Sequence, residues 1–146
     1  MKIWDLNGKL LDNRSLGTGR ILDVSYSSNS DTLAIASDCR PPLLYSLQAR
    51  SIRTLGNNVD TTATSFSNDG TVVLTGDTTG NIQLWSRTGR LLMTIFAPIH
   101  QGHSISQVGF GNSDSEILAI DINGRMSRHN LDLKRLLTLA NRWQAK

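Results

Sequence analysis

The sequence predicts an all-β protein that is built from repeated sets of short strands and ends in a short α-helix. Two observations support the all-β part. Leu, Ile and Val occur in short bursts between clusters of Ser, Thr, Asn and Gly, which favours many short strands over long helices. One type of segment also recurs along the chain, and recurrence at a fixed period is the signature of a repeat architecture.

The repeat is defined by two landmarks that keep a constant separation. The first landmark is an aromatic residue between small or aliphatic residues, and it occurs at Tyr26, Phe66 and Phe110. The second landmark lies 19 residues later in each copy, at Tyr45, Trp85 and His129. An extra copy of the second landmark, Trp4-Asp5, lies near the start of the chain. Three copies with one internal spacing indicate one structural unit, repeated at intervals of 40 and 44 residues.

Each repeat is expected to contain four strands. In the clearest copy the pattern predicts strands over residues 62–66, 71–75, 81–85 and 91–96. Asp69-Gly70 and Thr79-Gly80 are hairpin signals between them, because glycine adopts positive φ without steric cost. Pro41-Pro42 falls within the third strand of the preceding repeat, where it predicts an edge, a bulge or a distorted strand.

These landmarks resemble the WD40-repeat family of β-propellers. Trp4-Asp5 and Gly102-His103 match the two dipeptides of that family, and the repeat around Phe66 to Trp85 is the closest copy. The resemblance implies a partial WD40-type β-propeller of about three and a half four-stranded blades with a short C-terminal α-helix. The array would span residues 1–130, as the end of an incomplete repeat (1–14) followed by repeats at about 15–47, 56–87 and 100–130, and the helix would span 131–146.

The family also implies a buried network of His, Ser or Thr, Asp and Trp within each blade. By this resemblance His103 is the network histidine of the third repeat, and His100 is a loop residue. No repeat keeps all four residue types, because the turn aspartate is replaced by Cys39, Thr79 and Asn123 and the tryptophan by Tyr45 and His129. Asp77 and Asp121 occupy equivalent hairpin positions, which indicates a shared structural role. Four extra residues around 97–101 lengthen the loop into the third repeat.

The array begins in the middle of a repeat. We therefore expect a terminal piece of a propeller, a truncated product, or a half-ring that another copy completes, since propellers close with four to eight blades. An unclosed array exposes unpaired sheet edges, which favours association.

The C-terminus changes to helical spacing. One face carries apolar residues at helical intervals: Leu133, Leu136, Leu137, Ala140 and Trp143. Asp132 precedes them, where an acidic residue complements the helix dipole. The segment resembles the tail helix of bacterial, notably cyanobacterial, multi-repeat WD40 proteins, which often carry an NTPase or other signalling domain upstream.

The sequence favours no catalytic chemistry. His100 and His103 have no acidic residue near them in sequence, whereas a transition-metal site needs three or four convergent ligands. A Gly-x-Ser-x-Gly elbow and a phosphate-binding Gly-rich loop with lysine are both missing. We therefore expect no enzyme, no catalytic residue, no metal and no cofactor.

Composition restricts the partners. There are 15 basic and 12 acidic residues, a net charge of +3, and the basic residues are scattered, which favours a solvated surface over a nucleic-acid interface. No apolar run approaches the roughly 18 residues of a membrane helix, and no signal peptide is recognisable. With Cys39 as its single cysteine, the chain is expected in the cytoplasm.

Binding of a protein partner is therefore the predicted function. We expect a non-catalytic protein–protein interaction scaffold, with self-association that completes the propeller as a further expectation. The alternative is the C-terminal sensor or regulatory part of a signalling NTPase–WD40 protein. The family commonly binds partners through the loops between repeats and the turns between second and third strands. By position the candidate binding residues are Arg20, Cys39, Arg40, Asn58, Asp60, Thr78, Thr79, His100, Gln101, Ile122 and Asn123.

Overall fold

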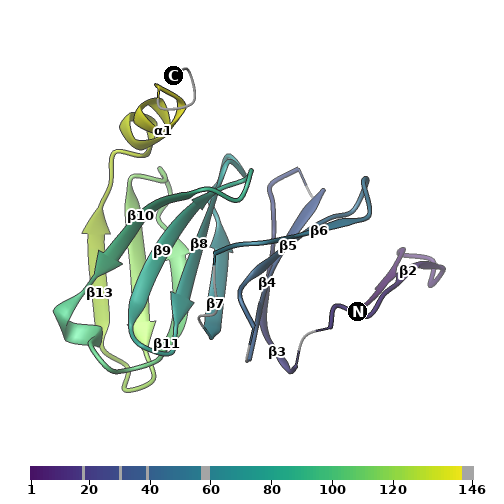
Figure 1. Ribbon diagram of the computed structural model, residues 1–146, viewed down its shortest axis with the longest axis horizontal. Coiled ribbons are helices and arrows are strands. Elements are labelled where there is room, and N and C mark those ends of the chain that lie inside the picture. The colour runs from purple at the N-terminus through teal and green to yellow at the C-terminus, as the bar shows by residue number, and fades with distance from the viewer. Residues whose placement is uncertain (18, 30, 39, 57–59, 143–146) are drawn as a thin grey trace.

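The residues that the structure describes fold into four consecutive antiparallel sheets and one α-helix (Figure 1). The computed structural model describes residues 1–17, 19–29, 31–38, 40–56 and 60–142. The first sheet is a hairpin of β1 (Lys2–Trp4) and β2 (Leu10–Asn13). The second sheet contains β3 (Ile21–Tyr26), β4 (Thr32–Ser37), β5 (Leu43–Ser46) and β6 (Ser51–Thr54).

The third and fourth sheets follow the same order. The third sheet contains β7 (Thr61–Phe66), β8 (Val72–Asp77), β9 (Asn81–Ser86) and β10 (Leu91–Phe96). A 3₁₀ turn, η1 (Pro98–His100), leads to the fourth sheet. This sheet contains β11 (Ile105–Phe110), β12 (Glu116–Asp121) and β13 (Met126–Asn130), and α1 (Leu133–Arg142) follows it.

The predicted strands of the clearest repeat agree with β7 to β10 to within two residues at each end. Turn chemistry explains the agreement. Gly70 adopts φ +70°, and the Gly70 and Ser67 amides donate to Ser67 O and Val72 O across the first turn. Glycine reaches this region of φ without the steric penalty of a side chain, so the reversal is fixed by sequence.

The sheets are stacked side by side through their first strands. β3 lies beside β7, and β7 lies beside β11, so the innermost strands of three sheets are neighbours. This arrangement is consistent with part of a propeller-like fold, and the sheets of the described residues do not close into a ring. The all-β class predicted from the sequence is confirmed.

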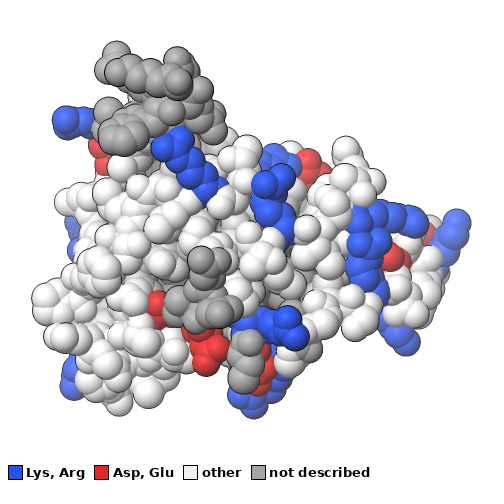
Figure 2. All heavy atoms as spheres, viewed as in Figure 1, with Lys and Arg blue, Asp and Glu red and all other residues white. Residues whose placement is uncertain are grey.

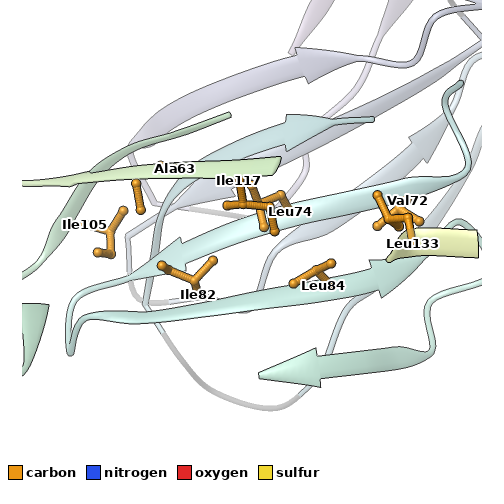
Figure 3. Close-up of a cluster of buried hydrophobic side chains, with 9 residues drawn as sticks. Ala63, Val72, Leu74, Ile82, Leu84, Ile105, Ile117 and Leu133 are labelled. Atoms are coloured by element: carbon orange, nitrogen blue, oxygen red, sulfur yellow. The ribbon is translucent and has the colours of Figure 1, made fainter. Parts of the chain in front are cut away.

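The largest apolar cluster lies between the third and fourth sheets (Figure 3). Leu74, Ile82 and Leu84 of the third sheet pack against Ile105 and Ile117 of the fourth, and all are fully buried. Burial of each such side chain contributes about 1.5–3 kcal/mol. The two sheets therefore form one core.

A second cluster joins the second and third sheets. Phe66, Val73 and Trp85 of the third sheet are buried against Ala34 and Leu44 of the second. Polar contacts add to this joint: Thr64 N donates to Asp23 Oδ2 over 2.8 Å, and the Arg87 guanidinium pairs with Asp31. Each sheet is thus fixed to its neighbour by apolar packing and by hydrogen bonds.

The N-terminal hairpin covers part of the outer face of the second sheet. Met1, Ile3 and Leu16 pack against a cluster that includes the buried Ile35 and Tyr45. The Tyr45 hydroxyl donates to the Asp12 carboxylate, and Arg50 Nη2 donates to Leu11 O over 3.3 Å. The incomplete first repeat predicted from the sequence is therefore a two-stranded sheet fixed to the next one.

Two strands depart from the four-strand pattern. The last repeat has three strands, and the predicted C-terminal helix follows it as α1, because the leucines after Asp132 are spaced for a helix. Leu133 is buried against Val72 and Leu84, and Arg135 N donates to Asp132 Oδ1 over 2.9 Å, as at a helix N-cap. In the second sheet, β5 begins only after Pro42, whose carbonyl accepts from Leu55 N. Trp143 lies outside the described residues.

No helix in the described part of the chain is both long enough and apolar enough to cross a lipid bilayer.

Candidate functional site

The loops between sheets and the turns between second and third strands lie at one end of the stack. The pairing register requires this, since Thr61 pairs with Asp77 and Ile105 pairs with Asp121. The first residue of each innermost strand therefore lies beside the last residue of the second strand. We call this end of the molecule the loop face, and the candidate binding residues all come from its segments.

Two aspartates shape the turns of the loop face. Asp77 Oδ1 accepts from Thr79 N over 2.8 Å and from Asn81 N over 2.9 Å. Asp121 Oδ1 does the same for Asn123 N and Arg125 N, over 2.8 and 3.0 Å. The shared role expected for these two aspartates is present. The turn carboxylate is therefore not replaced by Thr79 and Asn123, as the resemblance to the family implied, but lies two residues earlier.

His100 is the centre of a buried hydrogen-bonded cluster in the fourth sheet. Its Nδ1 lies 3.2 Å from Asp121 Oδ2, and its Nε2 lies 2.7 Å from Ser127 Oγ. His129 Nε2 lies 3.0 Å from the same hydroxyl. Each of these three contacts has one donor and one acceptor when His100 Nδ1 and His129 Nε2 carry the protons and Ser127 donates to His100.

This cluster corrects the roles expected for two histidines. We expected His103 in the network and His100 on the surface, but His100 is fully buried and cannot reach a partner with its side chain. The η1 turn is the reason, because His100 N donates to Ala97 O over 2.9 Å and the turn directs the ring back to the sheet. His103 lies beyond Gly102, with Nδ1 2.9 Å from Gln101 O.

The cluster lowers the pKa values of Asp121 and His129, which favours the charged form of the aspartate and the neutral form of the histidine. Burial by itself raises the pKa of Asp121, but hydrogen bonds from Arg125 N, His100 and Asn123 N outweigh burial and hold the pKa below its ordinary value. Burial lowers the pKa of His129, and charge on His100 lowers it further. The cluster therefore favours the ionised form of the Asp121 carboxylate and the neutral form of the His129 ring.

A pocket of about 300 Å³ lies beside this cluster, between the third sheet and the η1 loop. Its apolar wall is Phe96, Ala97 and Pro98, and the Phe96 side chain is highly exposed, at 75%. The rest of the lining is polar or glycine: Thr79, Gly80, Asn81 and Gln101. An apolar wall with hydroxyl and amide groups at its rim suits an apolar side chain attached to a peptide backbone.

The lengthened loop builds this pocket, and its backbone is held closely. Gly102 N donates to Thr79 O over 3.1 Å, and Gln101 N donates to Pro98 O over 3.3 Å. Gly80 adopts φ +94°, and a Cβ there would lie 2.0 Å from His100 O. The turn and the loop are therefore in direct backbone contact, and the pocket is formed before any partner binds.

A second cleft of about 380 Å³ lies where the three innermost strands meet. Each of these strands has a register shift near its start, and Leu22, Thr62 and Ser106 lie at the three shifts. The cleft is lined by Leu22, Asp23, Thr62, Ser106, Gln107 and Val108. A β-bulge locally interrupts the pairing of two strands. The same bulge occurs in all three innermost strands, and together the three bulges form the cleft.

The structure unites some of the candidate binding residues and separates others. Thr79 and Gln101 line the 300 Å³ pocket, and Thr78 N donates to Asp60 O over 3.1 Å. Arg20, Arg40, Ile122 and Asn123 are exposed on the loop face, and Arg20 N donates to Asp38 Oδ1. Asn58 and Cys39 lie outside the described residues.

Sequence reasoning did not identify Phe96, or the residues of the second cleft. Phe96 had a usable signal, because a large aromatic residue at the end of a strand directly precedes the four extra residues. The cleft had no local signal, since it needs three segments that are about 40 residues apart to meet.

Charged side chains alternate with uncharged surface on the side of the molecule that Figure 2 shows. In the view of Figure 2 the basic side chains form separate groups, the largest near the N-terminal hairpin, with uncharged surface between them. Within the described ranges no three His, Cys, Asp or Glu side chains gather in a way that could hold a metal ion.

No protein-family model matches this sequence, and no curated protein matches it either. The class that the fold defines is an all-β protein whose antiparallel sheets follow one another along the chain.

Proposed function

We propose that this chain is a WD40-type partial propeller that acts as a non-catalytic protein–protein interaction scaffold. The hydrogen-bonded groups support the WD40 assignment. His100, Asp121 and Ser127 form the kind of buried network that the resemblance implies, and Trp85 Nε1 donates to Thr75 Oγ1 over 3.0 Å in the preceding sheet. Rigid sheets that present loops at one end are a common arrangement for binding.

The pocket at Phe96 is the observation that favours binding. Phe96, which is 75% exposed, forms with Ala97 and Pro98 the apolar wall of a concave site that also has hydroxyl and amide groups, and binding pockets are commonly lined in this way. The bound group would be an apolar or aromatic side chain of a partner peptide, which would lie against Phe96 and Pro98. Thr79 and Gln101 would contact the backbone of the peptide at the rim.

A selection from random peptides displayed on phage tests this function. We expect the selected peptides to share an apolar or aromatic anchor residue. Binding of a fluorescently labelled selected peptide is then measured by polarisation. Phe96→Ser is expected to weaken it about 30-fold, the loss of about 2 kcal/mol that marks an interface anchor.

Leu91→Ser is the matched control, because Leu91 is an exposed apolar residue at the other end of the same strand. Peptide affinity should not change in this variant. A selection without a shared anchor, or peptides that bind Phe96→Ser as tightly as the unmodified chain, would contradict the proposal.

A further inference from the structure

The sheet stack leaves two complementary faces uncovered at its two ends. In each sheet, the leading face points towards the preceding sheet and the trailing face points towards the next one. The first four-stranded sheet carries Val24 and Tyr26 on its leading face, and the last sheet carries Leu118, Ile120 and Met126 on its trailing face. Val24, Tyr26 and Met126 are exposed, and Leu118 and Ile120 are half-buried. Among the described residues no further four-stranded sheet lies over either set.

Equivalent positions show what these faces do elsewhere in the chain. Tyr26 is 57% exposed, whereas Phe66, its equivalent 40 residues later, is 8% exposed because the second sheet covers it. Met126 is 58% exposed, whereas Ile82, its equivalent 44 residues earlier, is fully buried under the fourth sheet. The two exposed faces are thus the two halves of a joint that the chain forms twice internally.

The N-terminal hairpin already covers part of the leading face, so only the rest of that face is free to contact another molecule. The N-terminal hairpin covers Leu33, Ile35 and Tyr45 on β4 and β5, but it leaves the β3 side chains exposed. The uncovered strip is continuous with this interface. In both internal joints the innermost strands are neighbours, so β3 is the strand against which another β11 would lie.

A polar group is positioned for the same joint. Thr62 Oγ1 donates to Gly76 O of its own sheet and to Ile105 O of the next one, and so links the two sheets. Ser106 is the equivalent of Thr62, and its hydroxyl reaches Ile120 O and Asp121 O, both within its own sheet. A backbone carbonyl of a following sheet would complete the pattern, and the equivalent of Ile105 O is Ile21 O.

We propose that a second copy of this chain stacks on it head to tail, with the trailing face of β11–β13 of one copy against β3 of the other. The joint buries Val24 and Tyr26 against Leu118, Ile120 and Met126, and it places Ser106 beside the start of β3. Because the two faces differ, the interface is heterologous, and a discrete assembly forms when the ring closes.

Light scattering after size exclusion, over a wide range of protein concentrations, tests the proposal on the full chain. The chain is expected to form a discrete oligomer. Tyr26→Asp and Ile120→Asp each damage one face, and each should weaken association at least about tenfold. Tyr26 is largely exposed, so that replacement should leave the fold intact, and circular dichroism verifies this. Val24→Asp is a second variant of the leading face.

Mixing the two variants gives the decisive observation. Tyr26→Asp keeps an intact trailing face and Ile120→Asp keeps an intact leading face, so an equimolar mixture should form a heterodimer although neither variant associates alone. Leu91→Asp, at an exposed apolar position outside both faces, should leave the mass unchanged. A chain that stays monomeric at all concentrations, a variant pair that does not combine, or variants that keep the original mass would each overturn the proposal. Peptide binding at Phe96 is measured separately and does not depend on this result.

Discussion

The ring of His100 and the carboxylate of Asp121 are fully buried and lie 3.2 Å apart, although 21 residues separate them in the sequence. The contact joins the loop that enters the fourth sheet to the turn that follows β12. The contact therefore holds the loop face in place from within the sheet, and its removal should destabilise the fold.

Replacement of His100 should lower stability substantially. His100→Leu keeps most of the volume but removes the side-chain partner of Asp121 Oδ2 and leaves the Ser127 hydroxyl with His129 alone. A buried polar group that loses its partner costs about 1–3 kcal/mol. Urea unfolding followed by circular dichroism measures the change. His103→Leu is the control and should stay within about 0.5 kcal/mol. Equal losses in the two variants would show that the buried cluster is not the cause.

Stability should decrease as the pH falls below 6.5. The folded protein lowers the pKa of His129 from its ordinary 6.5, so the unfolded chain binds that proton more readily. The contribution of His129 to the free energy of unfolding is then fully present above about pH 6.5 and is lost as the pH falls through the folded pKa. The lowered pKa of Asp121 adds a second loss below 3.8. Urea titrations between pH 4.5 and 8 measure the first effect, and His129→Gln should flatten it. Parallel pH profiles for both proteins would exclude His129 as the source.

Replacement by alanine should affect stability differently at two strand glycines, Gly76 and Gly109. A Cβ at Gly76 would lie 2.4 Å from Ile105 Cγ2 and 2.7 Å from its Cβ, so Gly76→Ala forces the third and fourth sheets apart. Overpacking of this kind costs about 1–3 kcal/mol. A Cβ at Gly109 meets nothing within 4 Å, so Gly109→Ala should be neutral or add up to about 1 kcal/mol by restricting the unfolded chain. Thermal or urea unfolding at low protein concentration measures the stability of the two variants. The packing explanation fails if both variants change in stability by the same amount.

The buried indole N–H of Trp85 donates a hydrogen bond to the hydroxyl of Thr75, and this bond should contribute to stability. Trp85 Nε1 lies 3.0 Å from Thr75 Oγ1, and both residues are buried. Thr75→Val keeps the shape but removes the acceptor, and we expect a loss of about 1–3 kcal/mol in the free energy of unfolding. Thr54→Val, on the exposed strand β6, controls for the change of residue type and should stay within about 0.5 kcal/mol. A loss of the same size at both positions would refute the role of the hydrogen bond.

Much of the fold could be predicted because its signals are local. The turn at Gly70 and the alternating strand residues fix β7 to β10, and the spacing of Leu133, Leu136 and Leu137 fixes the helix. The site was less accessible to prediction. The histidine roles were exchanged because the 3₁₀ turn at Pro98 redirects the chain by a few residues, and no dipeptide motif encodes that redirection. The cleft at Thr62 and Ser106 requires strands that meet only after folding.

The stacking of the sheets has a consequence for the order in which the protein opens. Among the described residues, the extensive packing of the second, third and fourth sheets is with the sheet before or after them, so the free energy is close to a sum of single-sheet terms and nearest-neighbour terms. The third sheet has apolar joints on both sides, whereas the N-terminal hairpin has only one. Amide hydrogens in β8 and β9 should therefore exchange with solvent last and those of β1 and β2 first, so that the chain unravels from its ends towards the middle.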